Sequence, residues 1–151
     1  MFKFSVRAVQ DFAKFHKDEQ FYAFSINSSG LCFNSEEEFA KTLELSSKHY
    51  LNKYNNEIAI LNLKYDTGNW EYQYFVDLND GEGFDDELYS DHYHIPFENK
   101  NMNEEQLADL FSKTPYHQAM SLLLEKLNDA NIFELLNKTQ DFKAFLSEHD
   151  Y

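Results

Sequence analysis

The pattern of apolar and polar residues in the first part of the chain predicts a helix followed by a β-hairpin. Apolar positions recur at helical spacing over residues 5–17, and Ser5 can cap the start of this helix. The segment Phe21–Asn27 is rich in aromatic and β-branched residues, which favours a strand. Ser28-Ser29-Gly30 is typical of a turn and leads into a short partner strand at residues 31–34.

The following segment predicts a capped helix and then a central strand. Ser35 is followed by three glutamates, and Ser35 with Glu38 forms a predicted capping box. Asn55-Asn56 breaks the helix, and Ile58–Tyr65 is a nearly continuous apolar run, as expected for a strand that is covered on both faces. The buried stripe of the helix is predicted to consist of Phe39, Leu43, Tyr50 and Tyr54.

Residues 66–69 predict a turn, and the strand after it shows strict period-two alternation. After Leu78 the chain loses regular periodicity as far as Pro96, which predicts the longest loop of the protein. An aromatic strand face either packs in the core or binds a partner. The predicted faces are Trp70, Tyr72, Tyr74 and Val76 on one side, and Glu71, Gln73 and Phe75 on the other.

The last third of the chain predicts helices. Asn103 and Gln106 form another capping box, and Thr114-Pro115 combines a cap residue with proline at the first helical position. Shorter helical segments follow at Ile132–Leu136 and Phe142–Leu146. We therefore expect an α+β fold with a mainly antiparallel sheet of about four strands, covered by helices, and a helical C-terminal third.

Length and composition are those of one folded, acidic domain, spanning residues 1–151. Of the 151 residues 42% are hydrophobic, which is enough for a core. The chain has 27 acidic and 13 basic residues, a net charge of −14, which disfavours binding to nucleic acid or to an anionic membrane. Without a secretion signal or the ~20 consecutive apolar residues of a membrane span, the sequence predicts a cytoplasmic protein. Cys32 is the only cysteine, so an internal disulfide and a cysteine-based metal cluster are excluded.

The negative charge is concentrated in the middle of the chain. Residues 65–99 contain no Lys or Arg and ten Asp or Glu residues. Such a block is typical either of a solvated loop or of a surface that attracts a cationic protein, with the neighbouring aromatic residues as anchors. The candidate partner-binding residues are Asp77, Asp80, Glu82, Asp85, Asp86, Glu87, Asp91, Trp70, Tyr72, Tyr74, Tyr89 and Tyr93.

A cation site is the competing chemical interpretation of the same segment. The run from Asp77 to Gly81 does not match an EF-hand, because its glycine falls at the fifth position and Leu88 stands at the twelfth. His92 and His94, with Asp85 or Asp86, offer ligand types suited to zinc or manganese, but two histidines two residues apart point to opposite faces of an extended segment. We therefore predict no metal, and no cofactor, as bound groups.

Nucleotide-binding, nucleophile-elbow and zinc-protease motifs are missing from the sequence. Arg7 is the only arginine, which leaves few means of holding phosphate or carboxylate substrates. No residue can be singled out as catalytic, so we expect a protein that is not an enzyme.

Three segments together resemble a family of small bacterial proteins with a domain of unknown function. They are Phe21–Ile26, the run Cys32-Phe33-Asn34-Ser35-Glu36-Glu37, and the run Leu63-Lys64-Tyr65-Asp66-Thr67-Gly68-Asn69-Trp70-Glu71-Tyr72. Some similar acidic proteins are immunity proteins encoded beside polymorphic toxins. The resemblance implies an inhibitor that binds a cognate toxin, often a basic nuclease domain, and covers its active site. A metal-dependent enzyme that uses the Asp/His-rich loop and a structural, self-associating subunit are the alternatives.

Overall fold

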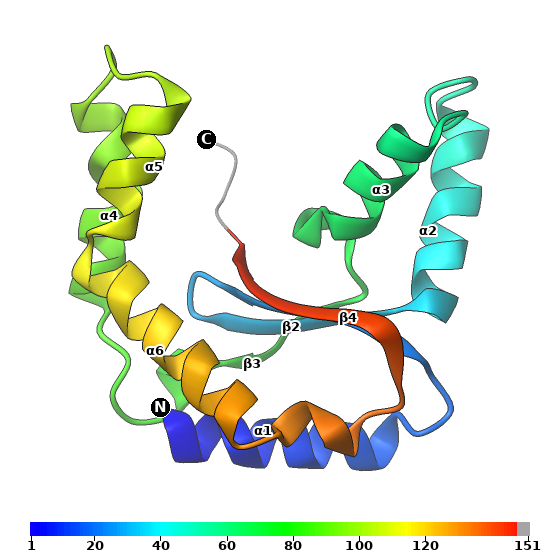
Figure 1. The fold of residues 1–151 in the computed structure, drawn as a ribbon, viewed down its shortest axis with the longest axis horizontal. Coiled ribbons are helices and arrows are strands. Elements are labelled where there is room, and N and C mark those ends of the chain that lie inside the picture. The colour runs from blue at the N-terminus through cyan, green and yellow to red at the C-terminus, as the bar shows by residue number, and fades with distance from the viewer. Residues whose placement is uncertain (148–151) are drawn as a thin grey trace.

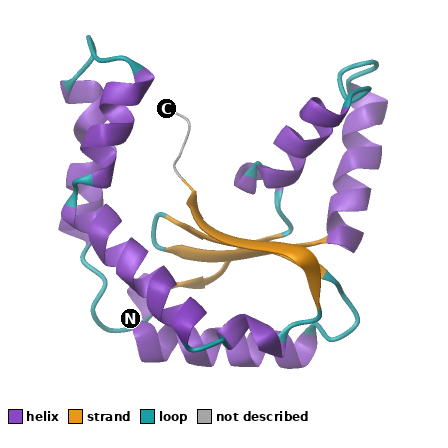
Figure 2. Ribbon diagram, viewed as in Figure 1, coloured by secondary structure: helices purple, strands orange, loops and turns teal. Residues whose placement is uncertain are grey.

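The computed structural model describes residues 1–147, in which six α-helices surround one four-stranded sheet (Figures 1 and 2). Short 3-10 helices are labelled η. None of the helices in this range is long and apolar enough to cross a membrane. The elements in chain order are α1 (Phe2–Phe15), β1 (Phe21–Asn27), β2 (Gly30–Ser35), α2 (Glu36–His49), α3 (Glu57–Tyr65), η1 (Thr67–Asn69), β3 (Tyr72–Asp77), η2 (Leu78–Asp80), α4 (Asp86–Glu98), α5 (Glu104–Ser112), α6 (Pro115–Asp129), η3 (Ile132–Leu135) and β4 (Lys138–Ser147).

The sheet has the strand order β3-β2-β1-β4. β1 pairs antiparallel with β2, and β2 pairs antiparallel with β3, whereas β4 lies parallel to β1 at the edge. The predicted α+β class, a mainly antiparallel sheet of four strands and the β1–β2 hairpin are thus confirmed, although one of the four strands comes from a different segment than predicted. The two central strands, β1 and β2, are buried along their whole length because helices cover both faces of the sheet.

Each face of the sheet contributes to a separate hydrophobic core. The first core lies between the sheet, α1, α6 and η3, and contains the fully buried Phe24 and Phe33. Burial of one such side chain contributes on the order of 2–3 kcal/mol. The second core, on the opposite face, packs Tyr22, Phe39 and Trp70 against α2 and α3. Helices α1 and α6 therefore cover one face of the sheet, and α2 and α3 cover the other.

The segment Ile58–Tyr65, predicted as a strand, forms α3 instead. The Asn56 side chain caps this helix by accepting a hydrogen bond from the Ala59 N–H at 2.9 Å. Only Leu63 of α3 is buried, and Ile58 is 73% exposed. The prediction was wrong because a short apolar run fits a helix as well as a strand, and the cap at Asn56 decides in favour of the helix.

The fourth strand comes from the C-terminal segment, where residues Phe142–Leu146 were predicted as a helix. β4 pairs with β1 in the register Phe24 to Ala144 and Ile26 to Leu146. Phe142, Ala144 and Leu146 pack against the first core, whereas Phe145 packs against the second. This period-two alternation is present in the sequence, and the free edge of β1 supplies the hydrogen bonds that make it a strand.

The segment from Leu78 to Pro96, predicted as the longest loop, contains η2 and most of α4. Asp85 caps α4, accepting hydrogen bonds from the N–H groups of Glu87 at 2.9 Å and Leu88 at 3.4 Å. Pro96 lies inside the last turn of α4 and does not prevent the helix from forming before it. The helix was missed because its apolar positions are few and its first turn is acidic, which is favourable at the positive end of a helix dipole.

Several helix starts were predicted correctly. The Asn103 and Gln106 capping box is present at α5, and Thr114 caps α6 ahead of Pro115. At α2 the Ser35 hydroxyl accepts from the Glu38 N–H at 3.2 Å, but the Glu38 carboxylate binds Lys41 instead of completing the predicted box. The first helix starts at Phe2 and not at Ser5, whose side chain is buried in the core-facing side of α1.

β3 does not keep the predicted alternation of its side chains. Its pairing with β2 shifts register between Leu31 and Phe33, and Tyr74 has a left-handed backbone conformation with φ of 48°. As a result Tyr72 and Phe75 both pack against the first core, although their positions in the sequence differ by an odd number. A bulge of this kind reorients side chains that a regular strand would place on opposite faces.

Candidate protein-binding surface

Helices α4 and α5 stand beyond one end of the sheet, at the left of Figure 1, and α2 and α3 stand at its other end. We call residues 77–112, which contain η2, α4 and α5, the acidic arm. This segment contains eleven Asp or Glu residues and a single cationic Lys or Arg residue, Lys100. The structure therefore extends the acidic segment seen in the sequence from α4 to α5, where Glu104, Glu105 and Asp109 add three more acids.

The predicted acidic site residues lie at the surface of this arm. Asp77 is half-buried and caps η2, accepting from the Asn79 N–H at 2.9 Å. Within residues 1–147 the arm has one ion pair, between Asp109 and Lys113. The exposed members of the predicted set are Asp80, Glu82, Asp85, Asp86, Glu87 and Asp91. None of these six forms an ion pair with another described residue, so together they give this surface a negative potential.

Aromatic side chains form a row along α4. Tyr89 and Tyr93 lie with ring centroids 6.2 Å apart, and Tyr93 and Phe97 lie 5.7 Å apart. Tyr89 is half-buried and its hydroxyl accepts a hydrogen bond from Ser28 at 2.9 Å, whereas Tyr93 is 38% and Phe97 52% exposed. Phe97 was not among the predicted residues, because the spacing of four residues becomes informative only once this segment is known to be helical.

The three aromatic site residues predicted on the strand after residues 66–69 lie in different environments, and Trp70 lies before the start of β3. Trp70 is 3% exposed in the second core, and its indole N–H donates to the Lys64 carbonyl at 2.9 Å. Tyr72 is half-buried and donates its hydroxyl proton to Glu19. Tyr74 is 40% exposed, and burial raises the pKa of its hydroxyl, opposed by a hydrogen bond with Ser28. Tyr74 is therefore the β3 residue that can extend the surface of the arm.

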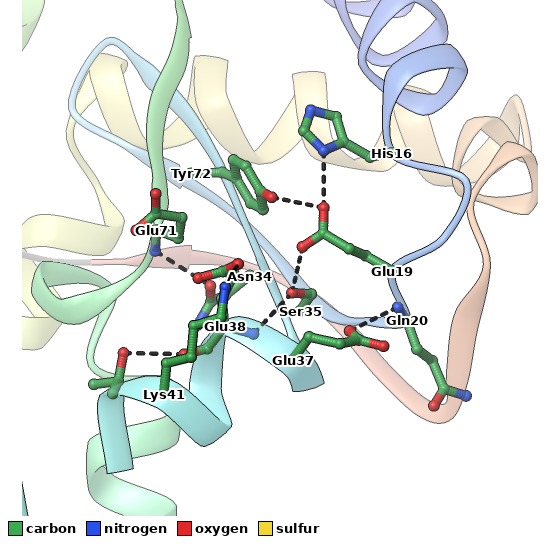
Figure 3. Close-up of polar contacts among 11 residues, drawn as sticks. His16, Glu19, Gln20, Asn34, Ser35, Glu37, Glu38, Lys41, Glu71 and Tyr72 are labelled. Atoms are coloured by element: carbon green, nitrogen blue, oxygen red, sulfur yellow. Dashed lines mark hydrogen bonds and ion pairs between the residues drawn. The ribbon is translucent and has the colours of Figure 1, made fainter. Parts of the chain in front are cut away.

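A polar network around Glu19 lies at the other end of β3 (Figure 3). One Glu19 oxygen binds His16 Nδ1 at 2.9 Å and the Tyr72 hydroxyl at 2.6 Å, and the other accepts from the Ser35 hydroxyl at 2.8 Å. Burial raises the pKa of the Glu19 carboxyl, but these hydrogen bonds and the charge of His16 outweigh burial and lower it. Both carboxylate oxygens are thus engaged by protein donors.

The Glu19 network holds three elements together. Glu19 lies between α1 and β1, Ser35 starts α2, and Tyr72 starts β3. Next to it the buried Asn34 donates to the Tyr22 hydroxyl at 2.9 Å and accepts from the Glu71 N–H at 3.2 Å. This arrangement is that of a structural anchor, because every oxygen of the carboxylate is used by neighbouring side chains.

The histidines proposed as metal ligands diverge. His92 is 4% exposed, and its Nδ1 lies 2.7 Å from the Thr114 hydroxyl. His94 is exposed, and its Nδ1 contacts the Ser90 carbonyl at 2.7 Å. Within residues 1–147 no group of three or more His, Cys, Asp or Glu side chains is placed to hold a metal ion.

Comparison with known proteins identifies a family. A family described as a domain of unknown function, DUF4303, matches residues 2–151. No curated protein and no solved structure matches the chain. The match covers nearly the whole length, and its description assigns no activity.

Proposed function

The chain belongs to the DUF4303 family of domains of unknown function, and we propose that it is an immunity-type protein that inhibits a cognate bacterial toxin. The acidic arm would bind the cationic surface that a nuclease-like toxin domain uses for nucleic acid, and would thereby cover its active site. The observation that carries the proposal is the set of exposed acids on the arm, of which only Asp109 forms an ion pair within the described residues.

Charge and aromatic anchors have different roles in this proposal. A surface of one sign accelerates association with a partner of opposite sign by about 10- to 1,000-fold. Residence time depends instead on side chains that lose their water in the complex, for which aromatic residues are best suited. On the arm these are Tyr93 and Phe97, which lie on α4, the helix that also contains Asp91.

The test uses the purified domain encoded by the open reading frame next to that of this chain. Glu87→Gln with Asp91→Asn neutralises two exposed acids of α4 and leaves the Asp85 cap intact. The matched control is Glu44→Gln with Glu57→Gln, two exposed acids on α2 and α3. We expect the first pair of substitutions to slow association severalfold at low salt, with a smaller effect at high salt, and the control pair to leave the rate unchanged.

Phe97→Ala is expected to increase the dissociation rate about tenfold or more without changing the dependence of association on salt. The proposal fails if the adjacent domain is not neutralised by this chain in co-expression. If both pairs of charge substitutions change the association rate equally, the acidic arm is not the binding surface.

Self-association is a second candidate, favoured by apolar side chains at the end of the α2–α3 pair. Leu45 is 60% exposed, Leu51 81% and Ile58 73%. If these exposed side chains form one contiguous patch in solution, they are suited to a protein contact. Sedimentation equilibrium of the chain and of a Leu51→Gln, Ile58→Gln variant tests it: a dimer that becomes a monomer in the variant supports a subunit role, and a monomer in both excludes it.

A further inference from the structure

A cavity of about 690 Å³ lies between the first two turns of α1, the segment after η2 and the middle of α6. Most of its walls are apolar, from Phe2 and Phe4 on α1 and Leu122 and Leu123 on α6. Gly81 allows the Phe4 ring to pack closely against the backbone, since a Cβ at this position would lie 2.6 Å from the ring. A cavity of this volume with an apolar lining is suited to a small ligand.

The cavity is bordered by three cationic side chains in a protein with a net charge of −14. Lys3, Arg7 and Lys126 are exposed, and none of them forms an ion pair with a carboxylate of residues 1–147. Glu82 is the one acidic residue in the lining. The border of this cavity is thus predominantly cationic in a chain that has 27 acidic and only 13 basic residues.

Two of these cations also repel each other. Lys3 and Arg7 are four residues apart on α1, and this spacing makes their two positively charged side chains neighbours on the helix surface. The first turn of this helix has no acidic residue. A bound anion would relieve this repulsion. Arg7 is the only arginine of the chain, and its planar guanidinium can bind a carboxylate or phosphate through two parallel hydrogen bonds.

We propose that this cavity binds a small anionic amphiphile, with its acyl chain against Phe2, Leu122 and Leu123 and its anionic head group between Lys3, Arg7 and Lys126. The apolar walls and the cationic border select such a ligand together. A neutral chain would leave the cations unpaired, and a small anion would leave the apolar walls in water. The cavity shares only Gly81 and Glu82 with the acidic arm and none of its residues with α4 or α5, so the proposal does not depend on the proposed immunity function.

The experiment titrates the purified chain with decanoate below its micelle concentration and follows binding by calorimetry and by amide chemical shifts. We expect one decanoate per chain, with shifts concentrated at the start of α1 and the middle of α6. Arg7→Gln and Lys126→Gln are each expected to weaken binding about fivefold, and the double variant more than tenfold. Lys17→Gln removes an exposed lysine outside the cavity and is expected to leave binding unchanged.

Decanol serves as the uncharged probe and is expected to bind at least about tenfold more weakly than decanoate. A Leu122→Asn variant tests the apolar wall, since Leu122 is 50% exposed and its replacement leaves the core intact. Equal binding of decanol and decanoate, no loss of affinity in the Arg7→Gln and Lys126→Gln variants, or no binding of decanoate to the folded chain would each overturn the proposal.

Discussion

Lowering the pH is expected to weaken the attachment of α4 to α6, because this attachment includes a buried, uncharged histidine. The His92 ring lies 4.7 Å from the Phe111 ring and 4.8 Å from the Tyr116 ring, between centroids. The Thr114 hydroxyl donates its one proton to the Phe111 carbonyl at 2.9 Å, so the His92 Nδ1–H donates to Thr114 Oγ1. A positive charge on His92 would be surrounded by apolar rings.

The size of the effect follows from the pKa of His92. Burial lowers this pKa from 6.5 to about 4, with a smaller contribution from the charge of His117. Between these values the unfolded chain takes up a proton and the folded chain does not, so the free energy of unfolding falls as the pH falls from 6.5 towards 4. The difference corresponds to about 3 kcal/mol, a large fraction of the stability of a typical domain.

Urea unfolding followed by circular dichroism, at several values between about pH 7.5 and 4.5, measures this effect. His92→Gln is expected to be less stable than the natural chain at neutral pH, because the ring contacts are lost. The difference between the two chains should shrink by about 2 kcal/mol or more towards pH 4.5, since the variant has no buried base to protonate.

The comparison with His92→Gln is needed because relief of repulsion in an acidic chain opposes the effect of His92 as the pH falls. His94→Gln, an exposed position on the same helix, is the matched control and should keep the pH dependence of the natural chain. A stability difference between the natural chain and His92→Gln that stays constant from pH 7.5 to 4.5 would refute the argument.

Three further predictions concern single contacts, each measured as the free energy of unfolding in urea. Glu19→Gln should lower the free energy of unfolding by about 1–3 kcal/mol at neutral pH. Because the pKa of Glu19 is lowered in the folded chain, its carboxylate stabilises the fold only while it is charged, so the variant should also lose less stability below pH 4.5 than the natural chain. Tyr72→Phe should reproduce part of this loss, and a Tyr72→Phe variant as stable as the natural chain would contradict a stabilising role of the Glu19 network. Gly30→Ala should cost about 1–3 kcal/mol, because its Cβ would lie 2.4 Å from the Tyr74 ring. The cost should largely disappear in a Tyr74→Ala background. Asn56→Ala should cost about 1 kcal/mol through loss of the α3 cap, and an unchanged stability would show that packing alone fixes this helix.

The sequence by itself determined those features that depend on near neighbours along the chain. The caps at Ser35, Asn103 and Thr114 form between residues three apart, so the sequence contains both partners. The hairpin of β1 and β2 follows from its turn residues in the same way. The concentration of acids in residues 65–99 is also a property of the sequence alone.

Pairing in the tertiary structure, together with the local cap at Asn56, decided which short apolar run became a strand. Ile58–Tyr65 and Phe142–Leu146 are each compatible with a helix or a strand, and both were assigned to the wrong element. The free edge of β1 could pair with only one further strand, and pairing with residues 138–147 buries side chains on both faces of the sheet. The sequence also does not show which aromatic residues lie at the surface. Trp70 is buried because it packs on α2 and α3, whereas Phe97 is exposed because of the position of α4. Burial depends on contacts between distant parts of the chain, which local periodicity does not contain.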